Sequence, residues 1–209
     1  GGGVVVIEDH HTNVIGITVN DALTEGNLSH DEDEPADASD TGYGKILSLL
    51  SISDLIQLAR DIDQSDRQYI MKGAEMNLLL SVAGLDLGKF GSQLKAMVEK
   101  KIVADDIFTS TKILTASATD ARMAGVNLPA MSSGCSGNQG IIAILVPYNV
   151  GIRQKVSLDK IVESIALSHL LNAYVKQYTG KIAPICGCSV AAGLGATAAI
   201  TYQTTFDAK

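Results

Sequence analysis

The sequence contains no tryptophan and few other aromatic residues, with six tyrosines and three phenylalanines among 209 residues. Glycine is plentiful instead, at 20 residues, and alanine is also frequent. We therefore expect helices that pack closely over small side chains. Because 46% of the residues are hydrophobic, the chain can bury the core of one good-sized domain or of two small ones.

Clusters of basic residues are also missing, and the formal net charge is −7 at pH 7. Nucleic acids and anionic membranes are bound mainly through grouped lysine and arginine side chains, so this balance argues against both as partners. The nearest candidate, Lys100 and Lys101 beside Glu99, is typical of a solvated surface pair.

No run of apolar residues is long enough to span a bilayer, and one candidate, 141–146, ends at Pro147. The first residues carry neither the charged segment nor the cleavage site of a signal peptide, and they include no initiator methionine. We therefore expect a cytoplasmic protein without membrane partners, and a sequence cut from a longer chain.

Cysteine is scarce, and the three cysteines lie in two glycine-containing stretches, 132–140 and 186–193. So few cysteines do not predict a disulfide-stabilised secreted protein, and reduced thiols are the simpler expectation. Thiolates can hold a metal or an iron–sulfur cluster, and a helix N-terminus favours the thiolate. One alternative is a buried cysteine that acts as a small hydrophobic residue. Another is a zinc site, with four candidate ligands: Cys135, Cys186, Cys188 and His169.

Hydrophobic patterning predicts an α+β fold. Two β-branched runs, 3–7 and 14–19, predict antiparallel strands joined by a polar turn, as the β-strand part of a larger α/β domain over 1–26. The acidic segment 27–44 is typical of a loop or linker more than of a metal site. The helical period after it predicts a mainly α-helical domain with glycine-rich loops over 45–209.

Capping signals predict where the first helices of this domain begin. A capping box over 51–54 predicts a helix, and Ser65 repeats the pattern and predicts a second helix that ends near Val82. Further helices are predicted over 92–101 and 105–123, from Ser157 to about Gly180, and from Ser189 onward. The positions predicted to face inward are Ile52, Leu55, Ile56, Ala59 and Ile62 in the first helix, and Leu158, Ile161, Val162 and Ile165 in the long one.

A loop between helices is predicted over 127–140. Its glycines and hydroxyls could form a nest of backbone N–H groups that binds a carboxylate or a phosphate, although the lysine of a P-loop is missing. The alternative is a tight structural loop. The candidate substrate-binding residues are Ser133, Ser136, Gly137, Asn138 and Gln139, of which the last two could hydrogen-bond the polar groups of an amino acid.

Three polar residues are candidate catalytic residues. His11, which follows His10 in the turn between the strands, could titrate near a substrate, or it could be an exposed turn histidine. Asp120 and Arg122 lie just before the glycine-containing loop. The arginine could hold a substrate carboxylate, and the alternative is a surface pair that adds little stability.

Several motifs occur in an order that resembles a known family: His11-Thr12-Asn13, then 119–125, 136–141, 166–170 and 185–193. Over nearly the whole chain, the sequence resembles the L-cysteine desulfidase family, also called the serine dehydratase-like alpha family. This family is related to the iron–sulfur L-serine dehydratases.

The resemblance implies an oxygen-sensitive [4Fe-4S] lyase without pyridoxal phosphate. Such an enzyme converts the small-molecule substrate L-cysteine to pyruvate, ammonia and sulfide by α,β-elimination. The alternatives are an L-serine dehydratase and a non-catalytic binding domain without a cluster. The resemblance also implies a homodimer, a substrate held by the Ser-Gly-Asn-Gln-Gly segment, and a cluster ligand at either Cys186 or Cys188.

The sequence departs from the family at two expected cluster ligands. Relatives have a cysteine near the N-terminus and another in a later Cys-Asp-Gly-Ala-Lys segment, whereas this chain ends with Phe206–Lys209. Cys135 stands where relatives usually have glycine or serine, so it is either a bystander or a replacement ligand. We expect a chain trimmed at both ends, with the cluster incomplete or absent.

Overall fold

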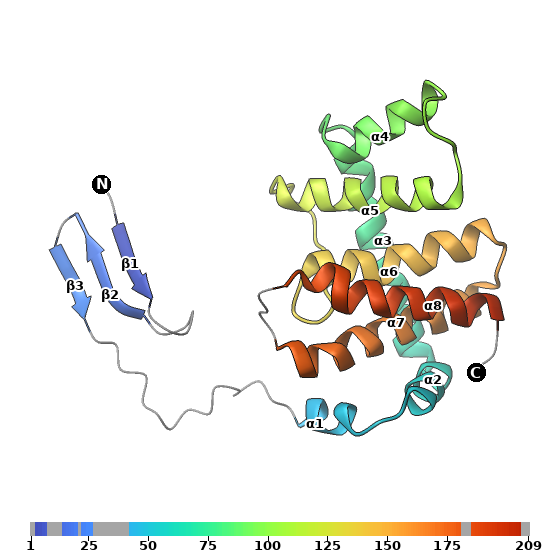
Figure 1. Ribbon diagram of the computed structural model, residues 1–209, viewed down its shortest axis with the longest axis horizontal. Helices are drawn as coiled ribbons and strands as arrows, with labels where there is room; N and C mark the ends of the chain where they lie inside the picture. Colours follow the sequence, from blue (N-terminus) through green and yellow to red (C-terminus); the bar gives the residue numbers. More distant parts are fainter. Residues whose placement is uncertain (1–2, 8–13, 21, 27–41, 181–184, 206–209) are drawn as a thin grey trace. The chain divides into compact units, whose positions relative to one another are not determined.

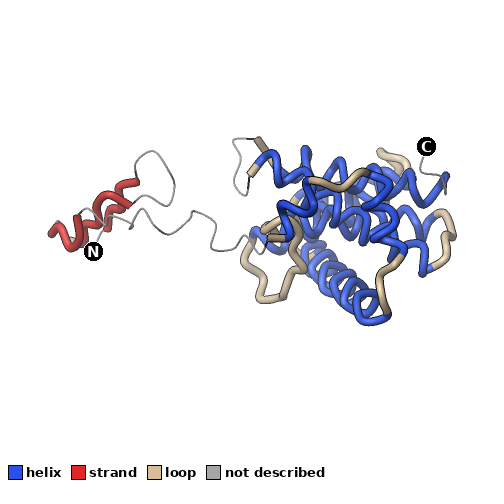
Figure 2. The backbone as a smooth tube through the Cα atoms, turned by 90° about the horizontal axis from the view of Figure 1, so that it is seen from below, coloured by secondary structure: helices blue, strands red, loops and turns tan. Residues whose placement is uncertain are grey.

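The structure is a computed structural model, which describes residues 3–7, 14–20, 22–26, 42–180 and 185–205. It divides the chain into two compact units, Gly1–Tyr43 and Gly44–Lys209. The described strands belong to the first unit, and the helices make up the second (Figures 1 and 2). The predicted α+β class is therefore confirmed.

The first unit contains a three-stranded antiparallel sheet in the order β1 (Gly3–Ile7), β2 (Val14–Val19) and β3 (Ala22–Gly26). The two predicted strands are confirmed, and they pair with Val5 opposite Ile17. The sequence analysis missed β3. Asn20 takes a left-handed φ of 51°, which asparagine tolerates better than most residues, and the chain turns back there into a short, partly polar strand.

The second unit is helical. Its elements are α1 (Tyr43–Ser48), α2 (Ile52–Arg60), α3 (Gln64–Leu85), α4 (Phe90–Glu99), α5 (Ile107–Met123), α6 (Gly137–Arg153), α7 (Leu158–Thr179), the π-helix η1 (Cys188–Ala192) and α8 (Gly193–Thr205). None of the helices in the described part of the chain combines the length and the apolar character that a membrane span requires.

Helix α2 begins as predicted, and α3 does not. Ser51 accepts the backbone N–H of Asp54, whose carboxylate accepts the N–H of Ser51, so the capping box is confirmed. For α3, the prediction of a cap at Ser65 is wrong, because Asp63 is the capping residue. Its carboxylate accepts the N–H groups of Ser65 and Asp66 at 2.8 and 2.9 Å, and the helix therefore starts one residue earlier than Ser65.

Helix α6 is the main correction to the predicted loop over 127–140. The last four residues of that range form the first turn of α6, and Ser136 is its N-cap. The helix then continues through Pro147, which is buried within it, to Arg153. Glycine and proline in one short stretch favour a loop by propensity, but burial of the apolar residues between them against neighbouring helices outweighs that preference.

The core of this unit lies between helices that pack in a stack (Figure 1). Helix α3 contacts α5, α6 and α7 in turn, and α8 lies against both α6 and α7. Of the positions predicted to face inward, Ile52 and Leu158 are exposed, because each lies at the first position of its helix, where only one side of the turn is covered. The others are buried or packed against the core: Leu55, Ile56, Ala59, Ile62, Ile161, Val162 and Ile165.

Small residues let α3, α4 and α5 approach at backbone distance, as the composition predicted. A Cβ atom on Gly84 would lie 1.8 Å from the carbonyl oxygen of Ser117, and one on Gly91 would lie 2.6 Å from the amide nitrogen of the same residue. Both contacts are to backbone, which cannot rotate away as a side chain can. The crossing of these helices therefore requires glycine at both positions.

We expect Gly84→Ala to destabilise the protein by about 2 kcal/mol or more, because overpacking against backbone forces the helices apart. Gly193→Ala is the matched control. Its new Cβ would lie 3.4 Å from the nearest atom, and alanine favours a helix by about 1 kcal/mol over glycine. Urea denaturation measures both changes, and equal stabilities for the two variants would contradict the packing assignment.

Candidate functional site

A tight turn precedes α6 and presents the first residues of the site. Ser133 and Ser136 exchange two backbone hydrogen bonds, at 3.0 and 3.1 Å, across a two-residue loop of Gly134 and Cys135. Both loop residues have positive φ, 53° and 65°, as a type I′ turn requires. A left-handed conformation is unusual for a non-glycine residue such as Cys135, and the side chain of this cysteine is exposed.

The amide of Gln139, in the first turn of α6, lies between two glycines from distant parts of the chain. A Cβ atom on Gly134 would lie 3.0 Å from Gln139 Oε1, and one on Gly187 would lie 2.4 Å from Gln139 Nε2. The same Cβ position on Gly134 would lie 2.9 Å from Nδ2 of Asn172, in α7. The turn, the first turn of α6, the middle of α7 and the Cys-Gly-Cys motif therefore meet at one place.

Two side-chain oxygens at this place lack a hydrogen-bond donor. Within the described part of the chain, no partner is found for Gln139 Oε1 or for Asn172 Oδ1. Gln139 is 6% exposed and Asn172 is fully buried. Leaving a buried acceptor without a donor costs roughly 1–3 kcal/mol, and the described residues supply no donor to either oxygen.

Helix α7 brings a row of buried polar residues to the site. They are spaced four residues apart and so lie on one face of the helix: Ser164, Ser168, Asn172 and Lys176. The stem of Lys176 passes 3.1 Å from the Cβ position of Gly134, so the far end of this row borders the turn. The sequence analysis missed Asn172 and Lys176, although the spacing of four polar residues was a readable signal.

Ser133 links Asn172 to His169, one helical turn away. The Ser133 hydroxyl oxygen accepts from Asn172 Nδ2 at 2.8 Å and lies 2.9 Å from His169 Nδ1. The hydroxyl proton can then bond to Nδ1, an assignment that places the ring proton of His169 on Nε2. Burial, which disfavours the charged ring, lowers the pKa of His169 to about 4, so the ring is neutral near pH 7.

Arg122 lies on the other side of the first turn of α6. Its Nη1 donates to Asn138 Oδ1 at 3.0 Å, and a Cβ atom on Gly137 would lie 2.3 Å from its Nε. The guanidinium is exposed, and its charge favours the thiolate of Cys188. The structure therefore places Arg122 against Gly137 and Asn138 at the start of α6, while Ser136 caps Gln139 in the same turn.

The two cysteines of the Cys-Gly-Cys motif have opposite pKa shifts. The backbone N–H groups of Cys188 and Ser189, at the start of the helical segment, lower the pKa of Cys186. Partial burial and the proximity of Cys186 raise the pKa of Cys188. Cys186 is exposed, so it is the thiol that reagents and metals reach in its reactive form.

These residues do not assemble a metal centre on their own. Across the described ranges, no three His, Cys, Asp or Glu side chains come close enough together to hold a metal ion. Cys135 therefore does not join Cys186 and Cys188 in one group, and neither does His169. The described residues supply a pair of thiols, which is fewer than the three ligands that a cluster with one open iron requires.

The remaining predicted residues lie elsewhere. Asp120 Oδ2 accepts the backbone N–H of Gly91 at 2.8 Å, so this carboxylate is directed to the start of α4 and not toward Arg122. His10 and His11 lie outside the described residues. The catalytic roles of Asp120 and His11 stay predictions.

Comparison with known proteins shows similarity over nearly the whole chain. The serine dehydratase alpha chain family matches residues 14–208. A UPF0597 protein of Elusimicrobium minutum is 48% identical over 98% of this chain and 47% of its own length. A UPF0597 protein of Geobacter sulfurreducens is 49% identical over 95% of this chain and 45% of its own length. The chain thus spans about half the length of the curated relatives it matches. No solved structure matches the chain.

We expect Cys186 to react with iodoacetamide at lower pH than Cys188. A lowered pKa gives Cys186 more thiolate at any pH below its ordinary titration range, while the raised pKa of Cys188 does the opposite. Mass spectrometry of the alkylated peptide measures both rates. Cys188→Ser is the control, because it keeps the backbone N–H that bonds Cys186 and should leave the Cys186 rate high. Faster labelling of Cys188 would contradict the assignment.

Proposed function

The chain belongs to the serine dehydratase alpha-chain family, and from this membership we propose that it holds an L-amino acid with a leaving group on Cβ, in an α,β-elimination lyase. The substrate we propose first is L-cysteine, which would give pyruvate, ammonia and sulfide. One observation carries the proposal: the two buried amide oxygens of Gln139 and Asn172 that lack donors.

An α-ammonium group fits these oxygens because it is a pure donor. It carries three N–H bonds and a positive charge, and hydrogen bonds to charged groups contribute about 1.5–3 kcal/mol each. Arg122 is our proposed partner for the carboxylate, because a guanidinium can bind it with two parallel hydrogen bonds. It stands at the N-terminus of α6, where backbone N–H groups also favour an anion.

The proposed reaction removes the α proton and breaks the bond between Cβ and sulfur. A base takes the α proton, the electron pair of the Cα–H bond forms the Cα–Cβ double bond, and sulfur leaves as hydrosulfide with the electron pair of the broken Cβ–S bond. The resulting aminoacrylate tautomerises to an imine, and water converts the imine to pyruvate and ammonia. In this scheme Gln139, Asn172 and Arg122 orient the substrate, and the same steps with hydroxide as the leaving group would dehydrate L-serine.

For the [4Fe-4S] cluster implied by the resemblance, we propose Cys186 as the thiolate ligand that this chain contributes. Support comes from its exposed side chain and from the N–H groups that lower its pKa. No orienting role above depends on the cluster. The second candidate function, a binding domain without a cluster, is favoured by the absence of any group of three ligands among the described residues.

We also propose a reducing, cytoplasmic setting, because all three cysteines are free thiols. The homodimer that the resemblance implies is likewise a proposal, and light scattering of the purified protein tests it.

We expect Gln139→Met to change stability and binding in opposite directions. Methionine has a similar volume and no carbonyl oxygen, so it removes a buried acceptor without a donor, and stability should hold or rise by about 1 kcal/mol. Binding of L-cysteine or L-serine should weaken about tenfold or more, because the ammonium loses a charged hydrogen bond. Calorimetric titration under reducing conditions measures the affinity, and urea denaturation measures the stability.

Gln93→Met, in α4, is the control for this substitution and should leave the affinity unchanged. Unaltered affinity in Gln139→Met would refute the role of this oxygen. Pyruvate formation by a full-length relative with the equivalent substitution separates the two candidate functions, since a binding domain forms none from either amino acid.

The cluster ligand has its own test. After anaerobic reconstitution of a full-length relative, we expect replacement of the residue equivalent to Cys186 by serine to lower the iron content well below that of the parent protein. Replacement at the position equivalent to Cys135 should leave the iron content unchanged. Full iron content without the Cys186 thiol would show that this cysteine is not a ligand.

A further inference from the structure

A cavity is lined in part by His169 and by Ser132, the neighbour of Ser133. It has a volume of about 450 Å³ and lies between α2, α3, α7 and the segment that leads into the turn before α6. Its volume is in the range of small-molecule sites. The residues that bind the proposed substrate, Gln139, Asn172 and Arg122, are not among those that line it.

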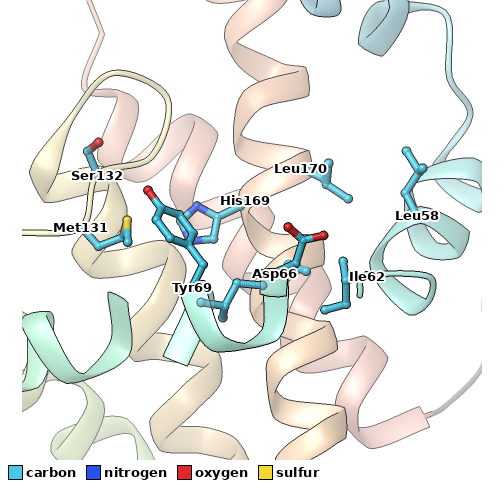
Figure 3. Close-up of a pocket in the computed structure, with 10 residues that line it drawn as sticks. Leu58, Ile62, Asp66, Tyr69, Met131, Ser132, His169 and Leu170 are labelled. Carbon is cyan, nitrogen blue, oxygen red and sulfur yellow. The ribbon is translucent and has the colours of Figure 1, made fainter. Parts of the chain in front are cut away.

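The polar side chains of this cavity gather toward one end, where Met131 also lies, and aliphatic side chains form the other end (Figure 3). Tyr69 and His169 lie together at the end near Ser132, and Leu58, Ile62 and Leu170 form the opposite end. The carboxylate of Asp66 stands between the two groups. A ligand that fills the cavity therefore meets hydrogen-bonding groups, then a negative charge, then apolar surface.

The charge of the cavity lining limits which charged groups a ligand can carry. Among the described residues around the cavity, Asp66 is the one with a formal charge, and no lysine or arginine is present to neutralise an anion. A simple carboxylic acid would be repelled, whereas an ammonium group beside Asp66 would be favoured.

The polar end can nevertheless accept a carboxylate that belongs to a zwitterion. In the tautomer in which the Ser133 hydroxyl donates to Nδ1 of His169, the ring proton lies on Nε2 and is available to another partner. The neutral ring that burial enforces, together with the hydroxyls of Tyr69 and Ser132, provides hydrogen-bond donors. These donors lie on the opposite side of the cavity from the aliphatic group.

We propose that this cavity binds an aliphatic L-amino acid, such as L-leucine, as a ligand distinct from the substrate. Its carboxylate bonds to His169, Tyr69 and Ser132, its ammonium pairs with Asp66, and its side chain packs on Leu58, Ile62 and Leu170. Because His169 also bonds to Ser133, occupancy of the cavity bears directly on the turn that carries Gly134 and Cys135. The proposal does not depend on the elimination chemistry, since leucine has no leaving group on Cβ.

Calorimetric titration of the chain with three related probes tests the proposal. L-leucine carries all three recognised groups, 4-methylpentanoate lacks the ammonium, and 3-methylbutylamine lacks the carboxylate. We expect saturable binding of L-leucine, and binding at least tenfold weaker for each of the other two. Absence of saturable L-leucine binding would overturn the proposal.

Substitutions of the lining residues test which of them contact L-leucine. Asp66→Asn should weaken L-leucine about tenfold and leave 4-methylpentanoate unchanged or stronger, because the substitution removes only the partner of the ammonium. Asp86→Asn makes the same charge change at the other end of α3 and should have no effect. Tyr69→Phe, which keeps the ring and so the packing, should weaken L-leucine severalfold. Equal L-leucine affinity in Asp66→Asn and the parent protein would refute the site.

Discussion

The amide of Gln139 is held between the backbones of Gly134 and Gly187, and the arrangement of the candidate site depends on this contact. The turn leads directly into the first turn of α6, whereas the Cys-Gly-Cys motif is distant from both in sequence. Because neither glycine has a side chain, the amide fixes the distance between the three segments directly. A larger residue at either position would have to displace the Gln139 amide, or else move the turn or the thiols away from α6.

The same principle operates throughout the helical unit. Gly84 and Gly91 lie against the backbone of Ser117, and Gly195 lies 2.5 Å, by its Cβ position, from the carbonyl oxygen of Ser168. With no tryptophan and few other large rings, the core fills by bringing helix axes close together and not by inserting bulky side chains. Close axes leave polar groups on α7 little room to reach water, which is why a row of them is buried there.

Most of the fold could be predicted because local signals were strong. The capping box at Ser51 and the helical period after it depend on neighbouring residues only, so they could be read without the tertiary structure. The start of α6 could not be read in this way. Ser136-Gly137-Asn138 favours a loop by propensity. The packing of the first turn of α6 against Arg122 and the backbone of Met131 outweighs that propensity. Asp63 and Ser65 are both residue types that cap helices well, and the backbone conformation of the folded chain determines that Asp63 is the N-cap of α3.

The candidate site was predictable in part. The residue types over 133–139 predicted polar recognition, a role that stays a prediction, and the structure places Arg122 beside Asn138. His169 was named only as a possible zinc ligand, and neither its contact with Ser133 nor the contribution of Asn172 was predicted, because both depend on which face of α7 meets the turn. The row of polar residues at intervals of four on α7 indicated that face. What the sequence could not provide was the partner segment, since Ser133 precedes His169 by 36 residues.

The π-helix η1 has a consequence for how this family can change over time. In it, the Gly193 N–H bonds to the carbonyl of Cys188, five residues back, so the segment holds one residue more than an α-helical turn. Each residue in an α-helix turns the chain by about 100°. Loss of a single residue from 188–192 would restore a regular helix, but it would rotate the thiols and Gly187 away from Gln139. Insertions and deletions here are therefore far more damaging than substitutions, and the length of this segment should be inherited more strictly than its composition.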